Sequence, residues 1–155
     1  MNKDRIYLDT SVFGGVFDDE FKEISQTLFD EIREEQFSLV TSALVQEEIK
    51  YAPQKVRDFF ESQLPLTEIL EINMEVLTLR EGYLKAGILN KKNSNDALHV
   101  ALASIANCKI IVSWNFKHIV HFDKIRLFNS VNIEMGYKSI EIYSPREVTY
   151  NEETD

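Results

Sequence analysis

Short apolar runs alternate along this chain with longer segments of helical periodicity, and this alternation is what most constrains the fold. Strands of a few residues separated by amphipathic helices are typical of α/β domains, in which helices pack on a sheet. We therefore predict an α/β fold. The predicted strands are Arg5–Asp9, Phe37–Thr41, Glu68–Ile72, Lys109–Ser113 and Ser139–Tyr143.

Capping residues mark several of the predicted helices. Ser42 and Asn73 carry side-chain oxygens suited to N-caps, and Gly87 suits the left-handed position that ends a helix. Between the last two strands the pattern assigns only a turn at Phe116–Ile119. The predicted helices are Phe21–Glu35, Ala43–Lys50, Gln54–Gln63, Met74–Ala86 and Asn95–Asn107, with a last helical turn from Pro145.

Composition and charge exclude several classes of protein. The chain has 155 residues, 44% of them hydrophobic, which suits one packed domain. Its net charge of −9 argues against broad nucleic-acid binding and favours a basic protein partner. Cys108 is the only cysteine, so we expect no intramolecular disulfide and a reducing, cytoplasmic location. We expect no signal peptide and no membrane span, because no apolar stretch approaches the roughly 20 residues required.

Three acids lie at the edges of apolar elements. Asp9 ends the first strand and is followed by the hydroxyls of Thr10 and Ser11. Glu48 is in the helix after the second strand, and Asp96 begins an apolar helix. Separate acids in such positions suggest a carboxylate pocket for a hard metal ion.

Each acid also has a simpler interpretation. Asp9 could cap a turn or helix, and Asp96 could interact only with the dipole of its helix. Glu48 could belong to a solvated helix face. Helix geometry nevertheless places Glu48 above the apolar Leu44 and Val45, so it should face inward while its neighbour Glu47 faces solvent.

The histidines and lysines are less specific. His99 lies one turn after Asp96, and a hydrogen bond to a neighbouring group is the simplest role for it. His118 and His121 are three residues apart, but no cysteine or His-Glu-x-x-His motif supports a zinc site. Lys91 and Lys92 form either a solvated loop or phosphate contacts.

Together these motifs resemble the PIN-domain family of metal-dependent ribonucleases, especially the VapC-type toxins. The resemblance extends from Tyr7 to about His118, with its motifs in the family's order. The segments that carry it are Tyr7–Ser11, Thr41–Ile49, Asn95–Ala103 and Ile111–Phe116.

The resemblance implies a three-layer α/β/α sandwich with a central parallel sheet, over residues 1–150, followed by an acidic tail at 151–155. Asp9, Glu48 and Asp96 match the family's metal-binding acids for Mg²⁺ or Mn²⁺. Asn115 falls where many relatives have a fourth aspartate, and we include it among the catalytic residues. The residues expected to support this site are Thr10, Ser11, Ser42 and Ser113.

The function implied is a metal-dependent endoribonuclease, the toxin of a type II toxin–antitoxin pair. Its expected partners are RNA and a small antitoxin that blocks the acidic pocket with a basic side chain, and a homodimer is possible. The alternative is a degenerate PIN domain that binds RNA or a protein without cleavage. Both Asn115 and the acidic charge favour that alternative.

Overall fold

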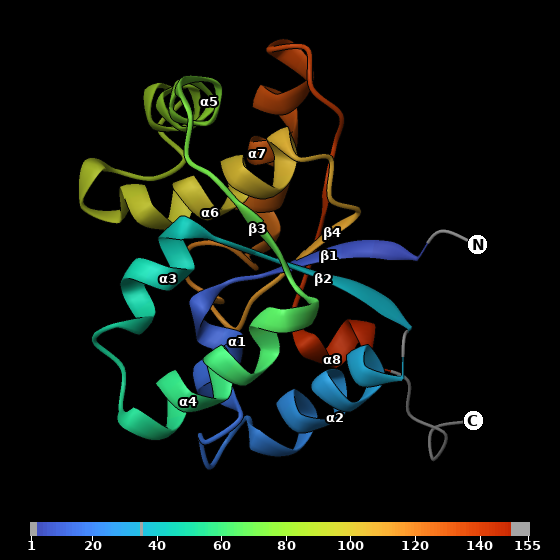
Figure 1. Ribbon diagram of the computed structural model, residues 1–155. Coiled ribbons are helices and arrows are strands. Elements are labelled where there is room, and N and C mark those ends of the chain that lie inside the picture. Colours follow the sequence, from blue (N-terminus) through green and yellow to red (C-terminus); the bar gives the residue numbers. More distant parts are fainter. Residues whose placement is uncertain (1–2, 35, 150–155) are drawn as a thin grey trace.

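The computed structural model describes residues 3–34 and 36–149, and at its centre is one parallel sheet (Figure 1). The strands of this part of the chain are β1 (Asp4–Leu8), β2 (Phe37–Ser42), β3 (Glu68–Leu70), β4 (Ile110–Val112) and β5 (Glu141–Tyr143). They pair in the order β3-β2-β1-β4-β5, and every pair is parallel. The predicted α/β class and central parallel sheet are therefore confirmed.

Helices cover both faces of the sheet and complete the three-layer sandwich (Figure 1). One face carries α1 (Thr10–Gly15), α2 (Lys22–Arg33), α4 (Gln54–Gln63) and α8 (Pro145–Val148). The other carries α5 (Met74–Lys85), α6 (Ser94–Ile105) and α7 (Phe122–Glu134). The remaining elements are α3 (Ala43–Ile49), which follows β2, and the short 3₁₀ turns η1 (Leu64–Leu66) and η2 (Lys91–Asn93).

Most predicted elements are present, with small differences at their ends. β3 ends at Leu70 rather than Ile72. α6 ends before Asn107, because that residue adopts a φ of 56°, in the left-handed region that stops a helix. Glu35, the predicted end of α2, and the predicted tail at 151–155 lie outside the described residues.

Two helices were not predicted, and each has a physical reason. α1 is only six residues long and begins directly after Asp9, so it is too short to show a period. In α7 the buried set includes the polar Asn132, while Phe122 and Ile133 are 78% and 66% exposed. This mixture obscures the apolar stripe by which a helix is recognised from sequence.

Asn132 is buried because it joins α7 to two other helices. Its Nδ2 donates hydrogen bonds to Ser104 Oγ (2.9 Å) and to the backbone carbonyl of Lys138 (3.2 Å). Tyr83, a buried residue of α5, donates its hydroxyl proton to Asn132 Oδ1. A satisfied polar cluster of this kind specifies one packing of α5, α6 and α7.

Helix α6 is the central helix of its layer. Each side chain from Ala97 to Ser104 is buried, which confirms the prediction made from its apolar sequence. The helix is therefore held between the sheet and α5, and its first turn has a well-defined position. Within the described residues, no helix is both long and apolar enough to cross a membrane.

The strand order reverses at β1. The chain adds β2 and β3 on one side of β1 and then crosses back to add β4 and β5 on the other. In open parallel sheets, ligands bind outside the carboxyl ends of the two strands at such a reversal. Those ends are Leu8 and Val112, which are paired in register. The topology therefore places a candidate site at the residues that follow, Asp9 and Ser113.

Candidate active site

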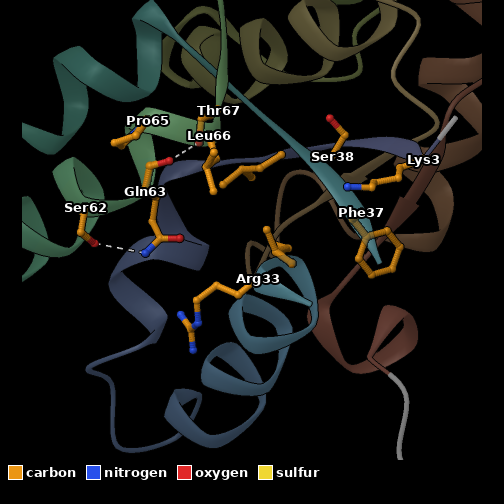
Figure 2. A pocket seen from close by; sticks show the side chains of 11 residues that line it. Lys3, Arg33, Phe37, Ser38, Ser62, Gln63, Pro65, Leu66 and Thr67 are labelled. Atoms are coloured by element: carbon orange, nitrogen blue, oxygen red, sulfur yellow. Dashed lines mark hydrogen bonds between the residues drawn. The ribbon is translucent and has the colours of Figure 1, made fainter. Parts of the chain in front are cut away.

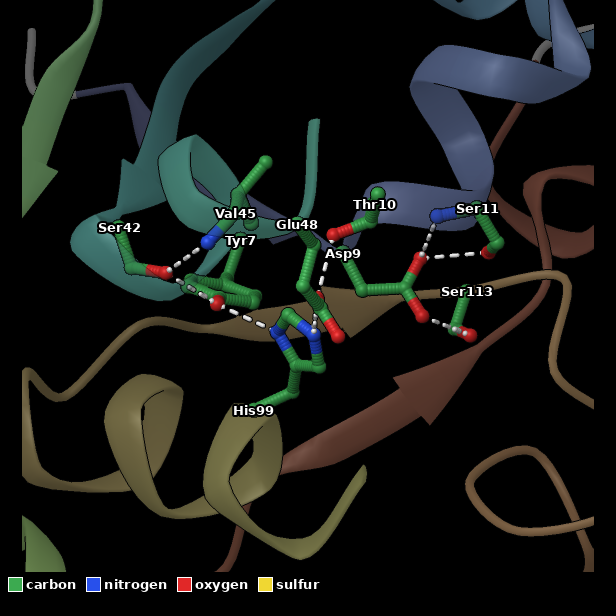
Figure 3. Close-up of polar contacts among 9 residues, drawn as sticks. All are labelled: Tyr7, Asp9, Thr10, Ser11, Ser42, Val45, Glu48, His99 and Ser113. Carbon is green, nitrogen blue, oxygen red and sulfur yellow. Dashed lines mark hydrogen bonds and ion pairs between the residues drawn. The ribbon is translucent and has the colours of Figure 1, made fainter. Parts of the chain in front are cut away.

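Asp9 lies at this reversal point and is buried, with 4% of its surface exposed. Its Oδ1 accepts hydrogen bonds from the backbone N–H (3.1 Å) and the Oγ (2.6 Å) of Ser11. Its Oδ2 accepts one from Ser113 Oγ (2.5 Å), at the end of β4, so this bond joins the ends of two strands (Figure 3). Asp9 also caps α1, so the simple capping role considered from the sequence is present as well.

The surroundings of Asp9 disfavour its charged form. Burial raises the pKa of Asp9 above the ordinary aspartate value, and the Glu48 carboxylate adds to this rise. His99 and the hydroxyls of Ser11 and Ser113 lower the pKa without cancelling the effect of burial. An anion at this position is costly unless a positive group accompanies it, so the pocket favours a proton or a cation beside Asp9.

Helix α3 brings Glu48 to the same edge of the sheet. Ser42 caps this helix by accepting a hydrogen bond from the backbone N–H of Val45 (3.2 Å). Glu48 Oε1 accepts hydrogen bonds from Thr10 Oγ1 (2.7 Å) and His99 Nε2 (2.7 Å) (Figure 3). Thr10 directly follows Asp9, so it links the second acid to the first.

The predicted phase of α3 is confirmed. The Glu48 side chain is 31% exposed, whereas Glu47 is 60% exposed and forms an ion pair with Lys50 (2.8 Å). Burial acts to raise the pKa of Glu48, yet the hydrogen bonds that Glu48 accepts from His99 and Thr10 leave that pKa below the ordinary glutamate value. Glu48 is therefore ionised at neutral pH.

Asp96 is in the first turn of α6, but its partner is a histidine. Asp96 Oδ2 and His118 Nδ1 are 2.8 Å apart. The loop that carries His118 follows β4, and Asn115 holds it by accepting a hydrogen bond from the backbone N–H of His118 (2.9 Å). Asn115 thus caps its own loop, and its N–H donates to Ser113 Oγ (2.9 Å).

The donor set suits a hard divalent cation only in part. Both contacts of Glu48 fall on Oε1, and Asp9 Oδ2 accepts a single bond, so each acid retains acceptor capacity. Over residues 3–34 and 36–149, however, no three His, Cys, Asp or Glu side chains are grouped closely enough to hold a metal ion. Asp9 and Glu48 have acceptor capacity for such an ion, whereas the carboxylate of Asp96 pairs with His118 through Oδ2.

A pocket elsewhere on the molecule is separate from these acids. It is lined by Phe37, Ser38 and Leu39 at the start of β2, with Arg33 and Leu66 nearby (Figure 2). The acids lie beyond the opposite, carboxyl ends of the strands. This pocket is therefore not part of the candidate site.

The structure adds three residues that sequence reasoning did not assign to the site, namely Tyr7, His99 and His118. Tyr7 precedes Asp9 by two residues on β1, so the two share a face of the sheet, and its hydroxyl contacts His99. His118 was considered only with His121, as a zinc pair, yet it contacts Asp96. The hydrogen-bonding role expected for His99 is confirmed.

Several solved structures share this fold. VapBC2 from Rickettsia felis, bound to a DNA fragment from its promoter, matches with a TM-score of 0.62 and 15% identity, over 90% of this chain and 98% of that chain. FitAcB from Neisseria gonorrhoeae matches with a TM-score of 0.60 and 16% identity, over 92% and 99%. FitAB bound to an IR36 DNA fragment matches with a TM-score of 0.62 and 16% identity, over 94% of this chain and 99% of that chain. At such low sequence identities, these structural similarities show a common fold and nothing more.

Sequence comparison gives the family. No curated protein matches the chain. The PIN domain, however, matches residues 6–128, which include Asp9, Glu48, Asp96 and the loop after β4. Since that match covers most of the 155 residues, the chain belongs to the PIN domain family.

Proposed function

We propose that this protein is a metal-dependent endoribonuclease and the toxin of a type II toxin–antitoxin pair. The observation that carries the proposal is the position of Asp9. It is a buried carboxylate at the reversal point of a parallel sheet, linked through Thr10 to a second carboxylate, Glu48. PIN domains are generally nucleases, and an acidic site of this kind suits the hydrolysis of phosphodiester bonds with a divalent ion.

The residues of the site have distinct roles in this proposal. Asp9, Glu48 and Asp96 would hold Mg²⁺ or Mn²⁺. The ion would lower the pKa of a bound water and neutralise charge on the phosphoryl oxygens. The protein orients its acids with hydrogen bonds: Ser113 and Ser11 hold Asp9, while Thr10 holds Glu48.

The substrate side of the proposal depends on local rather than overall charge. With a net charge of −9, the protein as a whole repels RNA. Lys91 and Lys92 are exposed in η2, directly before α6, the helix that has Asp96 in its first turn. In this proposal Lys91 and Lys92 contact the phosphates of the bound RNA.

The partner side of the proposal rests on a pocket next to the acids. Thr10, Gly14, Phe17, Ile49 and Val56 line it, between α1 and the α3–α4 segment. Since Thr10 also contacts Glu48, an antitoxin segment in this pocket could place a basic side chain against the acids. The complexes VapBC2 and FitAB share the fold, which supports an antitoxin partner. A homodimer in the cytoplasm is part of the same proposal.

Two observations favour the second candidate, a PIN domain that binds without cutting. Asp96 is paired with His118, and Asn115 stands where a fourth acid is expected and caps its own loop. Incubation of purified protein with total RNA, with Mg²⁺, with Mn²⁺ and with chelator, separates the two candidates. Cleavage that requires the metal supports the nuclease. RNA or metal binding without cleavage supports the second candidate.

The adjacent glutamates of α3 offer a matched pair of variants. Glu48→Gln is expected to weaken Mn²⁺ binding and cleavage by about 10–100-fold, because it removes a charge that faces the site. Glu47→Gln should leave both unchanged, because this side chain points to solvent. Titration calorimetry with Mn²⁺ and an RNA cleavage assay measure the two effects. Equal effects from the two variants would contradict the assignment of Glu48.

Asn115→Asp should strengthen the site if Asn115 can reach it. The variant adds a fourth carboxylate to the loop after β4, where Ser113 already contacts Asp9. Since aspartate also accepts the His118 N–H bond, the loop should keep its fold. We expect tighter Mn²⁺ binding, by several-fold, with equal or higher activity. Unchanged Mn²⁺ affinity would leave Asn115 as a structural cap only.

A further inference from the structure

A buried chain of hydrogen bonds connects the start of α3 to the carboxylate of Glu48. Ser42 Oγ and Tyr7 Oη are 2.8 Å apart, and Tyr7 Oη and His99 Nδ1 are 2.7 Å apart. His99 Nε2 contacts Glu48 Oε1 at 2.7 Å (Figure 3). Ser42 and Tyr7 are fully buried and His99 is 3% exposed, so these three side chains are shielded from bulk water.

The direction of proton donation along this chain follows from what each group can offer. Glu48 is ionised and can only accept, so His99 Nε2 must carry a proton and donate it. At the other end, Ser42 Oγ already accepts the backbone N–H of Val45. The described residues offer the Ser42 hydroxyl proton no acceptor other than Tyr7 Oη.

One arrangement satisfies every group. Ser42 donates to Tyr7, Tyr7 donates to His99 Nδ1, and His99 donates to Glu48. The opposite direction at Nδ1 would leave the Ser42 hydroxyl proton buried without a partner, which is unfavourable. This direction requires a proton on His99 Nε2, while Nδ1 accepts the proton of Tyr7. Both ring nitrogens are used, so His99 is not available as a metal ligand.

We propose that His99 is a positioning residue that holds the Glu48 carboxylate in its working orientation, anchored through Tyr7 and Ser42. Glu48 lies on the short helix α3 and its side chain is partly exposed, so without a partner it could adopt several rotamers. His99 restricts the Glu48 side chain, because His99 is itself fixed in the buried part of α6. Tyr7 ties the imidazole to β1, two residues before Asp9. The carboxylates of Asp9 and Glu48 are thereby held in a fixed position relative to each other.

This role for His99 rests on the proposed nuclease function, whereas the direction of the hydrogen bonds does not. The direction is tested on the unmodified protein by NMR with ¹⁵N-labelled histidine, which reports the protonation of each ring nitrogen. We expect His99 to be protonated on Nε2 and unprotonated on Nδ1 at neutral pH. A proton on Nδ1 would overturn the anchoring through Tyr7.

The positioning role is tested by substitutions that keep or remove the donor. His99→Leu removes the N–H that reaches Glu48, while His99→Gln keeps an amide N–H of similar reach. We expect His99→Leu to lower kcat and Mn²⁺ affinity by about 10-fold or more, with an unchanged KM for RNA, since loss of a group that orients a metal ligand costs about 10–100-fold. His99→Gln should recover much of this loss. The kcat and Mn²⁺ affinity of Tyr7→Phe should lie between those of His99→Leu and His99→Gln.

Matched controls separate positioning from folding. His121 is exposed and its side chain does not cap α7, so His121→Gln should behave as wild type. Tyr143→Phe removes a hydroxyl that contacts only the surface residue Glu141 among the described residues (3.2 Å). Melting curves verify that each variant is folded. If His99→Leu fails to fold, the comparison of Tyr7→Phe with Tyr143→Phe decides the question.

The outcomes are distinct. A folded His99→Leu or Tyr7→Phe protein that binds Mn²⁺ and cleaves RNA as wild type does would overturn the positioning role. Equal losses in His99→Leu and His99→Gln would also overturn it, since the donated proton would then not matter. If the wild type neither binds Mn²⁺ nor cleaves RNA, the proposed function fails and the positioning role fails with it. The NMR measurement then still decides whether the hydrogen-bond direction is correct.

Discussion

Asp96→Asn is expected to abolish RNA cleavage, a loss of at least about 100-fold, while the protein keeps its fold. Substitutions of residues that only orient a metal ligand already cost about 10–100-fold, and Asp96 is proposed as a ligand itself. The amide keeps the shape of the side chain, and its oxygen can still accept a hydrogen bond from His118. Cleavage of a labelled RNA in Mn²⁺ and a melting curve measure the two properties.

Asp123 provides the matched control for this substitution. It is also an acid in the first turn of a helix, α7, but its side chain is 65% exposed and pairs with Arg126 (3.4 Å). Asp123→Asn should retain wild-type activity. Full activity in Asp96→Asn, in a preparation free of contaminating nuclease, would remove Asp96 from the site and support a domain that does not cleave.

Millimolar Mn²⁺ is expected to raise the melting temperature of the wild type relative to chelator, and to raise that of Asp9→Asn less. A ligand at 100 times its dissociation constant stabilises a protein by about 2.7 kcal/mol. For a chain of this size that corresponds to roughly 5–10 °C. The effect should be large at neutral pH, because burial raises the pKa of Asp9 and makes its charge unfavourable without a cation. Identical melting curves with and without Mn²⁺ would contradict a metal pocket.

The same pKa shift predicts a pH dependence in chelator. Because the folded-state pKa of Asp9 is raised, the folded protein binds this proton more tightly than the unfolded chain. The contribution of Asp9 to stability therefore falls as pH increases through the raised pKa. Asp9→Asn lacks this term, so its melting temperature relative to wild type should increase from acidic to neutral pH. A constant difference across that range would mean that Asp9 is not destabilised by its charge.

Local signals in the sequence predicted the parts of the fold and site that depend on short-range order. The phase of α3 follows from Leu44 and Val45, so Glu48 could be assigned inward and Glu47 outward. The caps at Ser42 and Asn73 depend on residues three positions away, and both are present. The position of Asp9 after a strand placed it at the sheet edge. In each case the residues that determine the local structure are only a few positions apart in the sequence.

What the sequence could not show depends on contacts between distant segments. His118 meets Asp96 only after the loop following β4 folds back, and no spacing in the chain indicates that pairing. Helix α7 is stabilised by Asn132, whose partners Tyr83 and Ser104 are 49 and 28 positions away. A buried asparagine looks like a surface residue when its partners are unknown. The contact between Asp96 and His118 is therefore the main feature of the candidate site that the sequence did not indicate.

The hydrogen bond between Ser113 and Asp9 joins residues that are 104 positions apart, and this separation has a consequence during protein synthesis. A chain emerges from the ribosome N-terminus first, so β1 and α3 exist before β4 has been made. Until Ser113 emerges and β4 pairs with β1, Asp9 lacks one of its hydroxyl partners and one neighbouring strand. A ribosome-bound fragment that ends before β4 should therefore be inactive. If the proposed nuclease function is correct, the cell that makes this protein is exposed to the nuclease only after the chain has emerged from the ribosome as far as Ser113.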